Sequence, residues 1–219
     1  MSDNPAKRVI YNPDVFEVRT IDEAKRVVLT AEDATTEDRW RVETPYLAES
    51  IGAYLKPAAS SLIIDYGCGI GRMAKELIAQ HDCSVIGVDI STSMRQLAPG
   101  YVGNARFAAC SWNVVDAQID HGLQVDSVIA IWSLQHSPKV EDDIARIARA
   151  LKPGGQLYVC NLERAAVPTN LGWVDTGFAI QSLLAEAFEE VAIEPVSAEH
   201  TSDGIADVAF IGKYRKRSD

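Results

Sequence analysis

The stretch LIIDYGCGIGR, residues 62–72, places a short apolar run directly before three closely spaced glycines. A short apolar run that ends at glycines is typical of a buried strand turning into a helix. We therefore predict a strand at residues 61–65 and a helix behind the glycines. Glycines let a backbone approach a ligand closely, and the free N–H groups of a helix N-terminus favour an anionic group. The stretch thus predicts a site for a nucleotide-like ligand.

Strands and helices alternate along the rest of the chain. Further strands are predicted at residues 84–89, 105–110, 125–132 and 156–160, with helical periodicity between most of them. This alternation predicts an α/β fold with a doubly wound, mostly parallel sheet. Two late strands, at 191–193 and 208–211, are joined by a short polar connection, which favours an antiparallel pair at the sheet edge. The predicted sheet is therefore seven-stranded.

The chain is predicted to divide near residue 60. Residues 1–60 are expected to form an N-terminal helical appendage or lid, and residues 61–219 the main domain. Within the main domain, residues 161–177 show no regular periodicity and are predicted to be an irregular loop. Because irregular connections of that length are more often functional than incidental, this loop is a candidate wall of the site.

Proline and glycine mark the expected ends of three helices. Thr44-Pro45 is typical of a helix start, and so is Ser137 followed by a proline. Pro99-Gly100 is typical of a helix stop. We therefore expect helices to begin near residues 45 and 138 and another to end near residue 98.

The net charge of −10 disfavours binding to a phosphate backbone. The one basic cluster, at residues 213–217, is expected to be a solvated tail. The four cysteines show neither metal-ligand nor disulfide spacing, so no metal is expected. No stretch is apolar for long enough to span a membrane, and no leader-like segment begins the sequence. We expect a cytoplasmic protein without nucleic-acid or membrane partners.

An acidic residue closes each of the first two predicted strands, at Asp65 and Asp89. A carboxylate in the position of Asp89 can accept hydrogen bonds from both hydroxyls of a ribose. A dinucleotide fingerprint, GxGxxG, would need a glycine at position 72, where this chain has Arg72. The observed pattern, DxGxGxG, therefore argues against a dinucleotide cofactor.

The stretch at residues 62–72 resembles the first motif of the class I S-adenosylmethionine-dependent methyltransferases. Three more segments continue the resemblance in family order: VIGVDIS at 85–91, VDSVIAIWSLQHSP at 125–138 and RALKPGGQLYV at 149–159. Each segment is a weak signal alone, and together they are strong. The resemblance implies a Rossmann-like fold, S-adenosylmethionine as cofactor and an enzyme that transfers a methyl group.

The resemblance also implies which residues bind the cofactor. The glycine-rich loop would hold the methionine moiety, the second-strand carboxylate the ribose, and the residue after it one face of the adenine. Where many members place an Asp that accepts from the adenine amine, this chain reads Cys110-Ser111-Trp112, so the Ser111 hydroxyl, backbone groups and stacking on Trp112 stay open as alternatives. The first-strand carboxylate is expected near the amino group of the cofactor, or to tie together the N–H groups of the loop. The cofactor-binding candidates are Asp65, Gly67, Cys68, Gly69, Gly71, Asp89, Ile90, Ser111, Trp112 and Trp132.

The methyl acceptor is expected beyond the carboxyl ends of the fourth and fifth strands. His136 lies there, either as a base for the acceptor or as a residue that orders the loop beside the cofactor. The appendage and the predicted irregular loop supply the acceptor-binding candidates, each of which could instead be a packing or solvated residue. They are Trp40, Tyr46, Asn161, Arg164 and Trp173.

The leading hypothesis is a methyltransferase acting on an oxygen or nitrogen of a small molecule. The sequence leaves two alternatives open: a methyltransferase acting on protein or RNA, and a non-catalytic module that binds S-adenosylmethionine. Acceptor pockets vary independently of the fold, so the fold does not name the acceptor.

Overall fold

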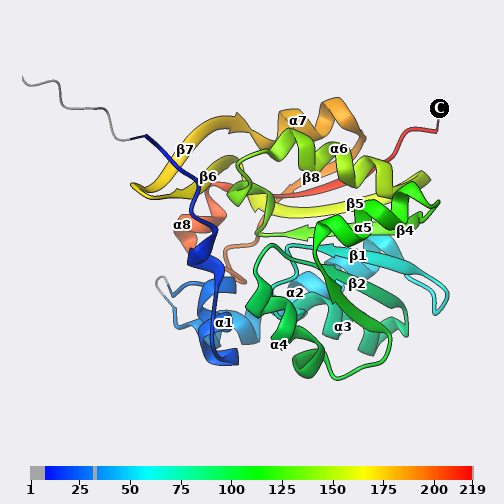
Figure 1. The fold of residues 1–219 in the computed structure, drawn as a ribbon, viewed down its shortest axis with the longest axis horizontal. Coiled ribbons are helices and arrows are strands. Elements are labelled where there is room, and N and C mark those ends of the chain that lie inside the picture. The colour runs from blue at the N-terminus through cyan, green and yellow to red at the C-terminus, as the bar shows by residue number, and fades with distance from the viewer. Residues whose placement is uncertain (1–7, 32–33, 219) are drawn as a thin grey trace, which may run out of the picture.

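The structure, a computed structural model, describes residues 8–31 and 34–218, without the side chain of Asp203. A seven-stranded sheet in the order β3-β2-β1-β4-β5-β9-β8 runs through this part of the chain (Figure 1). Its strands are β1 (Leu62–Tyr66), β2 (Ser84–Val88), β3 (Phe107–Cys110), β4 (Val125–Ile131), β5 (Leu151–Leu162), β8 (Glu189–Pro195) and β9 (Ala209–Arg215). The first five are parallel, and β9 is antiparallel to β5 and β8. The predicted mostly parallel sheet with an antiparallel edge pair is confirmed.

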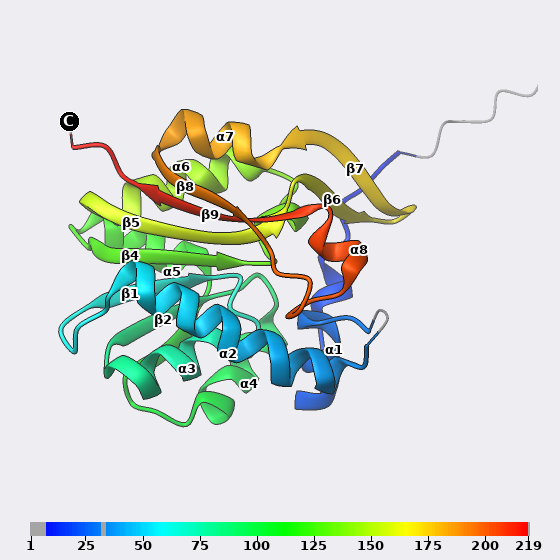
Figure 2. The same cartoon turned by 180° about the vertical axis from the view of Figure 1, so that it is seen from behind.

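Within the described residues, three longer helices pack on each face of the sheet. One face carries α2 (Thr36–Leu55), α3 (Arg72–His81) and α4 (Thr92–Val102), and the other α5 (Trp112–Asp120), α6 (Val140–Ala150) and α7 (Ile180–Ala187) (Figures 1 and 2). Neighbouring residues of β1 face opposite sides, so Ile63 packs in the first apolar cluster and Ile64 in the second. By the same alternation Asp65 and Tyr66, at the end of β1, are directed to opposite faces.

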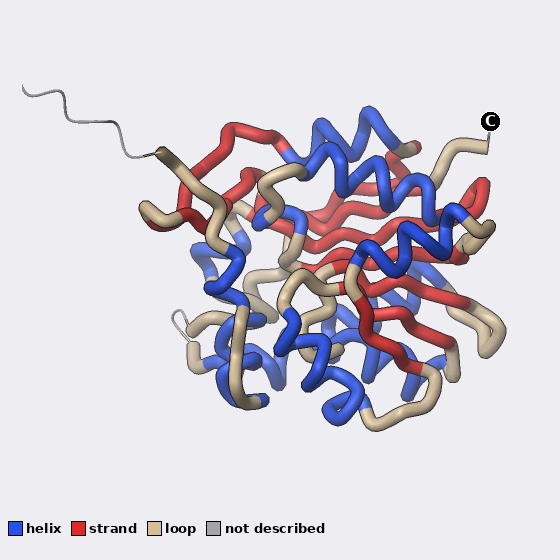
Figure 3. The backbone as a smooth tube through the Cα atoms, in the orientation of Figure 1, coloured by secondary structure: helices blue, strands red, loops and turns tan. Residues whose placement is uncertain are grey.

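The short elements gather at the carboxyl ends of the parallel strands. They are the 3-10 helices η1 (Pro13–Phe16) and η2 (Leu134–His136), α1 (Ile21–Val28), α8 (Asp203–Ala206), and the hairpin of β6 (Arg164–Thr169) and β7 (Gly172–Ala179). Figure 3 shows this hairpin beside the N-terminal segment, apart from the main sheet. A third apolar cluster packs Val18, Leu29 and Trp40 on Ile70 of the glycine loop and Met94 of α4. No helix in the described ranges is long and apolar enough to cross a membrane.

The prediction of an irregular loop at residues 161–177 is wrong, because β5 extends to Leu162 and the hairpin of β6 and β7 follows. The hydroxyl of Thr169 accepts from the N–H of Leu171 and donates to the carbonyl of Gly172, which closes the turn. The sequence does not indicate this hairpin, because Pro168 argues against a strand at residues 164–169. In addition, β7 is exposed along most of its length, so its hydrophobicity does not alternate.

The predicted helix start at Thr44-Pro45 is also wrong. Helix α2 begins at Thr36, where the Thr35 hydroxyl accepts from the N–H of Asp38, and Pro45 lies inside the helix. A proline there removes one helical hydrogen bond, and this cost is offset by a face whose Leu47 and Ile51 side chains are fully buried. Residues 36–55 are therefore a packed covering helix of the sheet.

Two further predicted helix ends are displaced. Helix α4 continues through Pro99-Gly100 to the buried Val102 and ends at Gly103, whose φ of 63° is in the left-handed region. Helix α6 begins at Val140 rather than beside Ser137, because Ser137 lies in the turn after η2. Burial of the last turn of α4 outweighs the local stop signal.

Candidate active site

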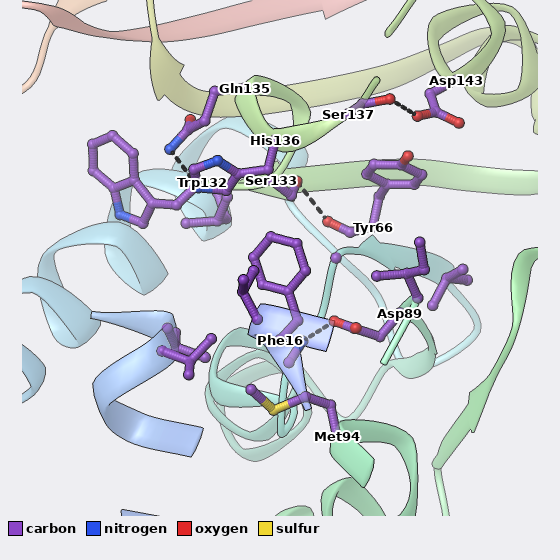
Figure 4. Close-up of a pocket in the computed structure, with 18 of the residues that line it drawn as sticks. Phe16, Tyr66, Asp89, Met94, Trp132, Ser133, Gln135, His136, Ser137 and Asp143 are labelled. Atoms are coloured by element: carbon purple, nitrogen blue, oxygen red, sulfur yellow. Dashed lines mark hydrogen bonds between the residues drawn. The ribbon is translucent and has the colours of Figure 1, made fainter. Parts of the chain in front are cut away.

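A cavity of about 940 Å³ opens at the carboxyl ends of the parallel strands (Figure 4). Its floor includes Gly67 and Gly69 after β1, Asp89 after β2, Ser111 after β3 and Trp132 after β4. The strand order reverses between β1 and β4, and open α/β sheets bind ligands at such a reversal. Sites for small molecules measure roughly 300–1,000 Å³, so this cavity is near the upper end.

The glycine loop is held against β2 and leaves two glycines at the cavity. The N–H groups of Gly67 and Cys68 donate to the carbonyl of Val88 at 2.7 and 3.0 Å. A Cβ at Gly69, whose φ is 53°, would lie 2.7 Å from Val28 and would narrow the cavity. A Cβ at Gly71 would instead lie 2.5 Å from Val102 of α4.

Two residues of the loop therefore differ from their expected role as cofactor contacts. Gly71 does not line the cavity. Its missing side chain instead leaves room for α4 to pack closely against the start of α3. Cys68 is buried and lines only a void of about 20 Å³ beside the cavity. The loop residues that can meet a ligand in the cavity are Gly67 and Gly69.

Asp89 points a fixed carboxylate into the cavity. Its Oδ2 accepts from the N–H of Gly69 at 2.7 Å, and its Oδ1 accepts from the N–H of Ser91 at 2.8 Å. Burial raises the pKa of Asp89, and these two hydrogen bonds counteract the rise. Because a carboxylate has about four lone-pair positions, each oxygen can accept one more hydrogen bond. The group is thus oriented by backbone and still able to hold two hydroxyls.

Asp65 lies deeper, beside the cavity rather than in its wall. Burial raises the pKa of Asp65 to about 7, and Oδ2 has no hydrogen-bond partner among the described residues. The carboxyl group lines the void of about 20 Å³, which shares Val28, Gly67 and Ile131 with the cavity. An unpartnered buried carboxyl oxygen favours a cationic or hydrogen-bonding ligand nearby.

The residues expected to contact the adenine follow the carboxyl ends of β2 and β3. Ser111 lines the cavity, and its hydroxyl makes no hydrogen bond to the described part of the chain. Trp112 also reaches the cavity, but its ring packs edge-on against Tyr66 with centroids 5.6 Å apart. Ile90 stands at the rim with most of its side chain exposed. Ser111 and Ile90 are therefore free to meet a flat ligand.

His136 faces the cavity from η2 with its proton position defined. Its Nδ1 lies 2.8 Å from the carbonyl oxygen of Ala166, which can only accept, so Nδ1 carries the proton and Nε2 keeps its lone pair. The side-chain nitrogen of Gln135 lies 3.3 Å from Nε2 (Figure 4). Burial lowers the pKa of His136 below its usual 6.5. The imidazole is therefore neutral at physiological pH and has an acceptor nitrogen.

Three rings from distant segments form an aromatic wall of the cavity, made of Phe16, His136 and Trp173. The ring centroids of His136 and Trp173 are 5.0 Å apart, and those of Phe16 lie 5.8 Å from His136 and 6.3 Å from Trp173. All three residues line the cavity. Trp173 is thus the one acceptor-binding candidate that reaches the cavity.

Trp40 and Tyr46 do not line the cavity. Trp40 is buried in the third apolar cluster with the cationic groups of Lys25 and Arg72 each 5.4 Å from its ring, so it is a packing residue. Tyr46 stacks on His200 with ring centroids 4.3 Å apart. Neither ring reaches the cavity wall, because each is already packed against other side chains.

Asn161 and Arg164 are also absent from the cavity wall. Asn161 is fully buried, and its amide accepts from the N–H of Gln135 and donates to the carbonyl of Leu162. Arg164 is exposed and pairs with Asp175 at 3.5 Å. Asn161 therefore orders the turn that carries η2, and Arg164 belongs to the surface of the hairpin.

Residues 8–18, which we call the strap, cross the cavity and were not among the predicted site residues. Tyr11 forms a β-bridge with Thr169 of the hairpin, and Tyr11 and Phe16 line the cavity. At the other end, the carboxylate of Glu17 accepts from the N–H groups of Thr92 and Ser93 and from the Ser93 hydroxyl. The strap is thus fastened on both sides of the cavity, and its sequence has no periodicity that would have indicated this.

A buried charge cluster around Glu43 supports the cavity from behind. Glu43 is fully buried, and its Oε1 accepts from the indole N–H of Trp132 at 2.7 Å and from Arg72 at 3.2 Å. Its Oε2 accepts from Arg39 at 3.1 Å. Trp132 has a φ of 54°, unusual for a bulky residue, and it lines the cavity. Glu43 therefore ties α2 to α3 and to a cavity residue.

A mostly parallel sheet of this order with a glycine loop after β1 and a carboxylate after β2 is typical of a Rossmann-like nucleotide-binding fold. A family model described as a methyltransferase domain matches residues 64–159, which include that loop and Asp89. This match and the fold described above support a class I S-adenosylmethionine-dependent methyltransferase. No group of three His, Cys, Asp or Glu side chains in the described ranges is placed to hold a metal ion.

Two sequence relatives of the chain are named O-methyltransferases. The chain is 27% identical to O-methyltransferase rstn1 of Aspergillus nomiae over 75% of this chain and 70% of that protein. It is 29% identical to O-methyltransferase resE of Aspergillus sclerotiorum over 60% of this chain and 51% of that protein. The chain thus spans about half the length of the second relative.

Solved structures share the fold at low identity. A geranyl diphosphate methyltransferase in complex with SAM has a TM-score of 0.62 and 15% identity, over 80% of this chain and 86% of that one. The [4+2]-cyclase SpnF has a TM-score of 0.62 and 20% identity, over 80% of this chain and 82% of that one. Because one fold carries both of these named activities, the reaction has to be argued from the residues of the site.

Proposed function

We propose that this methyltransferase transfers a methyl group from S-adenosylmethionine to a hydroxyl oxygen of a small molecule. The single observation that carries the proposal is a neutral histidine, His136, which lines a cavity of about 940 Å³ and whose Nε2, among the described residues, accepts only one long hydrogen bond, from Gln135 at 3.3 Å. The O-methyltransferase names of the first two relatives favour oxygen over nitrogen as the acceptor atom.

The residues of the cavity fit the cofactor. Asp89 would hold the ribose hydroxyls, and the loop at Gly67 and Gly69 would carry the methionine moiety. The unpartnered Oδ2 of Asp65 supports an ammonium group nearby, reached directly or through the adjoining void. Ser111 would recognise the adenine edge.

When bound, S-adenosylmethionine supplies an electrophilic methyl group on a sulfonium sulfur. The chain's part is to position the acceptor and to manage its proton. His136 would take the hydroxyl proton at Nε2 while Nδ1 stays hydrogen-bonded to the Ala166 carbonyl, which keeps the ring in the required tautomer. Gln135, whose Oε1 accepts from the N–H of Leu162, donates to Nε2 at 3.3 Å, and the acceptor hydroxyl would take the place of this long hydrogen bond.

Replacing Asp89 with Ala is expected to weaken the complex with S-adenosylhomocysteine at least tenfold. The change removes the acceptor of two ribose hydroxyls, and hydrogen bonds to a charged group are worth about 1.5–3 kcal/mol. Isothermal titration calorimetry measures the affinity. Glu141→Ala, which removes an exposed carboxylate from α6, is the matched control and should bind like the wild type. Unchanged affinity in Asp89→Ala would show that the ribose is held elsewhere.

The strap and α1 would together act as a lid over the cavity. Both contribute residues to the cavity wall, among them Phe16 and Val28, and a lid excludes water from the transfer. Helix α2, by contrast, belongs to the packed layer of the domain.

Glu17→Ala is expected to loosen this lid. The hydrogen bonds from Ser93 lower the pKa of Glu17, so the contact is present at neutral pH and is lost only as the pH falls below 4.5 through the lowered pKa. An exposed carboxylate at a helix N-terminus contributes little, so amide exchange at residues 15–18 should quicken by about two- to fivefold at pH 7. Asp14→Ala, in the same 3-10 helix, should leave exchange unchanged. Equal rates in both variants would mean that the strap is held by its hairpin end alone.

The function itself is tested with S-adenosylmethionine labelled on its methyl group and a metabolite extract. Label should appear in the small-molecule fraction, with S-adenosylhomocysteine formed in equal amount. Label in added protein or RNA would replace the proposal with a macromolecular methyltransferase. Binding of the cofactor without transfer to any fraction would indicate a non-catalytic module.

A further inference from the structure

The aromatic wall of Phe16, His136 and Trp173 has free ring surface toward the cavity. Trp173 lines the cavity and is 56% exposed, although a tryptophan ring usually gains from burial. Its neighbours Phe16 and His136 come from the strap and from η2, so three separate segments bring their rings together. Rings with centroids about 4.5–7 Å apart and tilted planes attract one another and accept a further ring in the same way.

The surroundings of this wall are apolar. The cavity residues contributed by β5, β6 and α8 are Leu162, Ala166 and Ile205. The charged lining residues that the structure describes come from other segments: Arg26 and Arg39 from the N-terminal helices, Asp89 and Arg95 from the region of β2 and α4, and Lys139, Asp143 and Arg146 from the region of α6. Neither the wall nor the three apolar residues carries a charge, so a charged group on an acceptor ring stacked there would gain no ionic partner from them.

We propose that the acceptor is an uncharged, flat, unsaturated ring that carries a hydroxyl group, and that its ring stacks on Trp173 and Phe16. This inference rests on the proposed function and specifies the substrate class of the same site. The stacked ring would lie beside His136, which is itself part of the wall, so the hydroxyl proton of the ring can pass to its Nε2. A saturated ring of similar size would bury as much apolar surface but would lack the aromatic contact.

The test compares three probes bound to the protein saturated with S-adenosylhomocysteine: naphthol, its saturated counterpart decahydronaphthol, and hydroxynaphthoate. Calorimetry should find naphthol about five- to tenfold tighter than decahydronaphthol, the range that aromatic contacts supply. Hydroxynaphthoate should bind at least tenfold more weakly than naphthol. Equal affinities of the two neutral probes, tighter binding of the carboxylate, or no binding of naphthol would each overturn the inference.

Variants of the hairpin assign the preference to the wall. Trp173→Ala should reduce the ratio between naphthol and decahydronaphthol to less than twofold, and Trp173→Phe should restore most of it. Leu171→Ala is the matched control, because Leu171 is 50% exposed in the turn of the same hairpin and does not line the cavity. An unchanged ratio in Trp173→Ala would contradict the inference.

The same titrations separate this inference from the proposed function. If S-adenosylhomocysteine does not bind, the cofactor assignment fails, whatever the affinities of the ring probes are. If S-adenosylhomocysteine binds and the ratio between the neutral probes is one, only the acceptor class is wrong.

Discussion

His136→Gln is expected to lower turnover by about 10²–10⁴-fold on the true acceptor, with nearly unchanged affinity for S-adenosylhomocysteine. The wild-type ring donates from Nδ1 to the carbonyl of Ala166 and presents Nε2 as a base. A glutamine amide can keep a hydrogen bond to that carbonyl but cannot accept a proton at neutral pH. Turnover measured as S-adenosylhomocysteine formed, beside calorimetric affinity for the same compound, tests both halves of the expectation.

The pH profile gives a second readout of the same residue. His136 is active as a base only when it is neutral, and burial lowers its pKa below 6.5, so the acidic limb of turnover should lie below pH 6.5. His136→Gln should lose this limb, whereas His121→Gln, at an exposed histidine, should keep it. If affinity for S-adenosylhomocysteine falls in parallel with turnover, His136 orders the loop beside the cofactor and is not a base.

The positions of the glycine loop and of Asp89 at the cavity could be predicted because their determinants are local in sequence. The glycines after β1 and the carboxylate after β2 follow strand ends that hydrophobic runs already indicate. The N–H of Gly69 donates to Asp89 across two neighbouring parallel strands, so the position of each strand end also fixes this contact. Gly71, the third glycine of the same loop, lies away from the cavity wall and allows α3 and α4 to pack closely.

The acceptor half could not be predicted, because its walls form through contacts between distant segments. Phe16 and Trp173 meet only when the strap pairs with the hairpin at Tyr11 and Thr169. Trp40 was a reasonable candidate by composition, but its ring is buried and lies 5.4 Å from the cationic groups of both Lys25 and Arg72. A single sequence does not reveal which aromatic residue will be covered by the rest of the fold.

The role of Glu43 could not be predicted from the sequence either, because its partners come from distant segments. Removing its buried charge is expected to lower the stability of the protein strongly. In sequence Glu43 is an ordinary helical glutamate, whereas its partners Arg72 and Trp132 lie 29 and 89 residues away. Glu43→Ala should lower the free energy of unfolding by about 3–5 kcal/mol, because Arg39 and Arg72 would remain buried without the carboxylate that pairs with both. With a urea dependence of about 1–3 kcal/mol per molar, the unfolding midpoint should fall by at least roughly 1 M.

Two comparisons attribute this loss to charge rather than to the packing of α2. Glu49→Ala removes an exposed glutamate from the same helix and should change stability by less than about 0.5 kcal/mol. Replacing the whole triad, with Glu43→Leu, Arg39→Met and Arg72→Met together, should recover most of the lost stability, since apolar residues of similar volume can replace a buried ionic group. If the triple variant stays as unstable as Glu43→Ala, the hydrogen bond from Trp132, which both variants lack, stabilises the cluster more than its charges do.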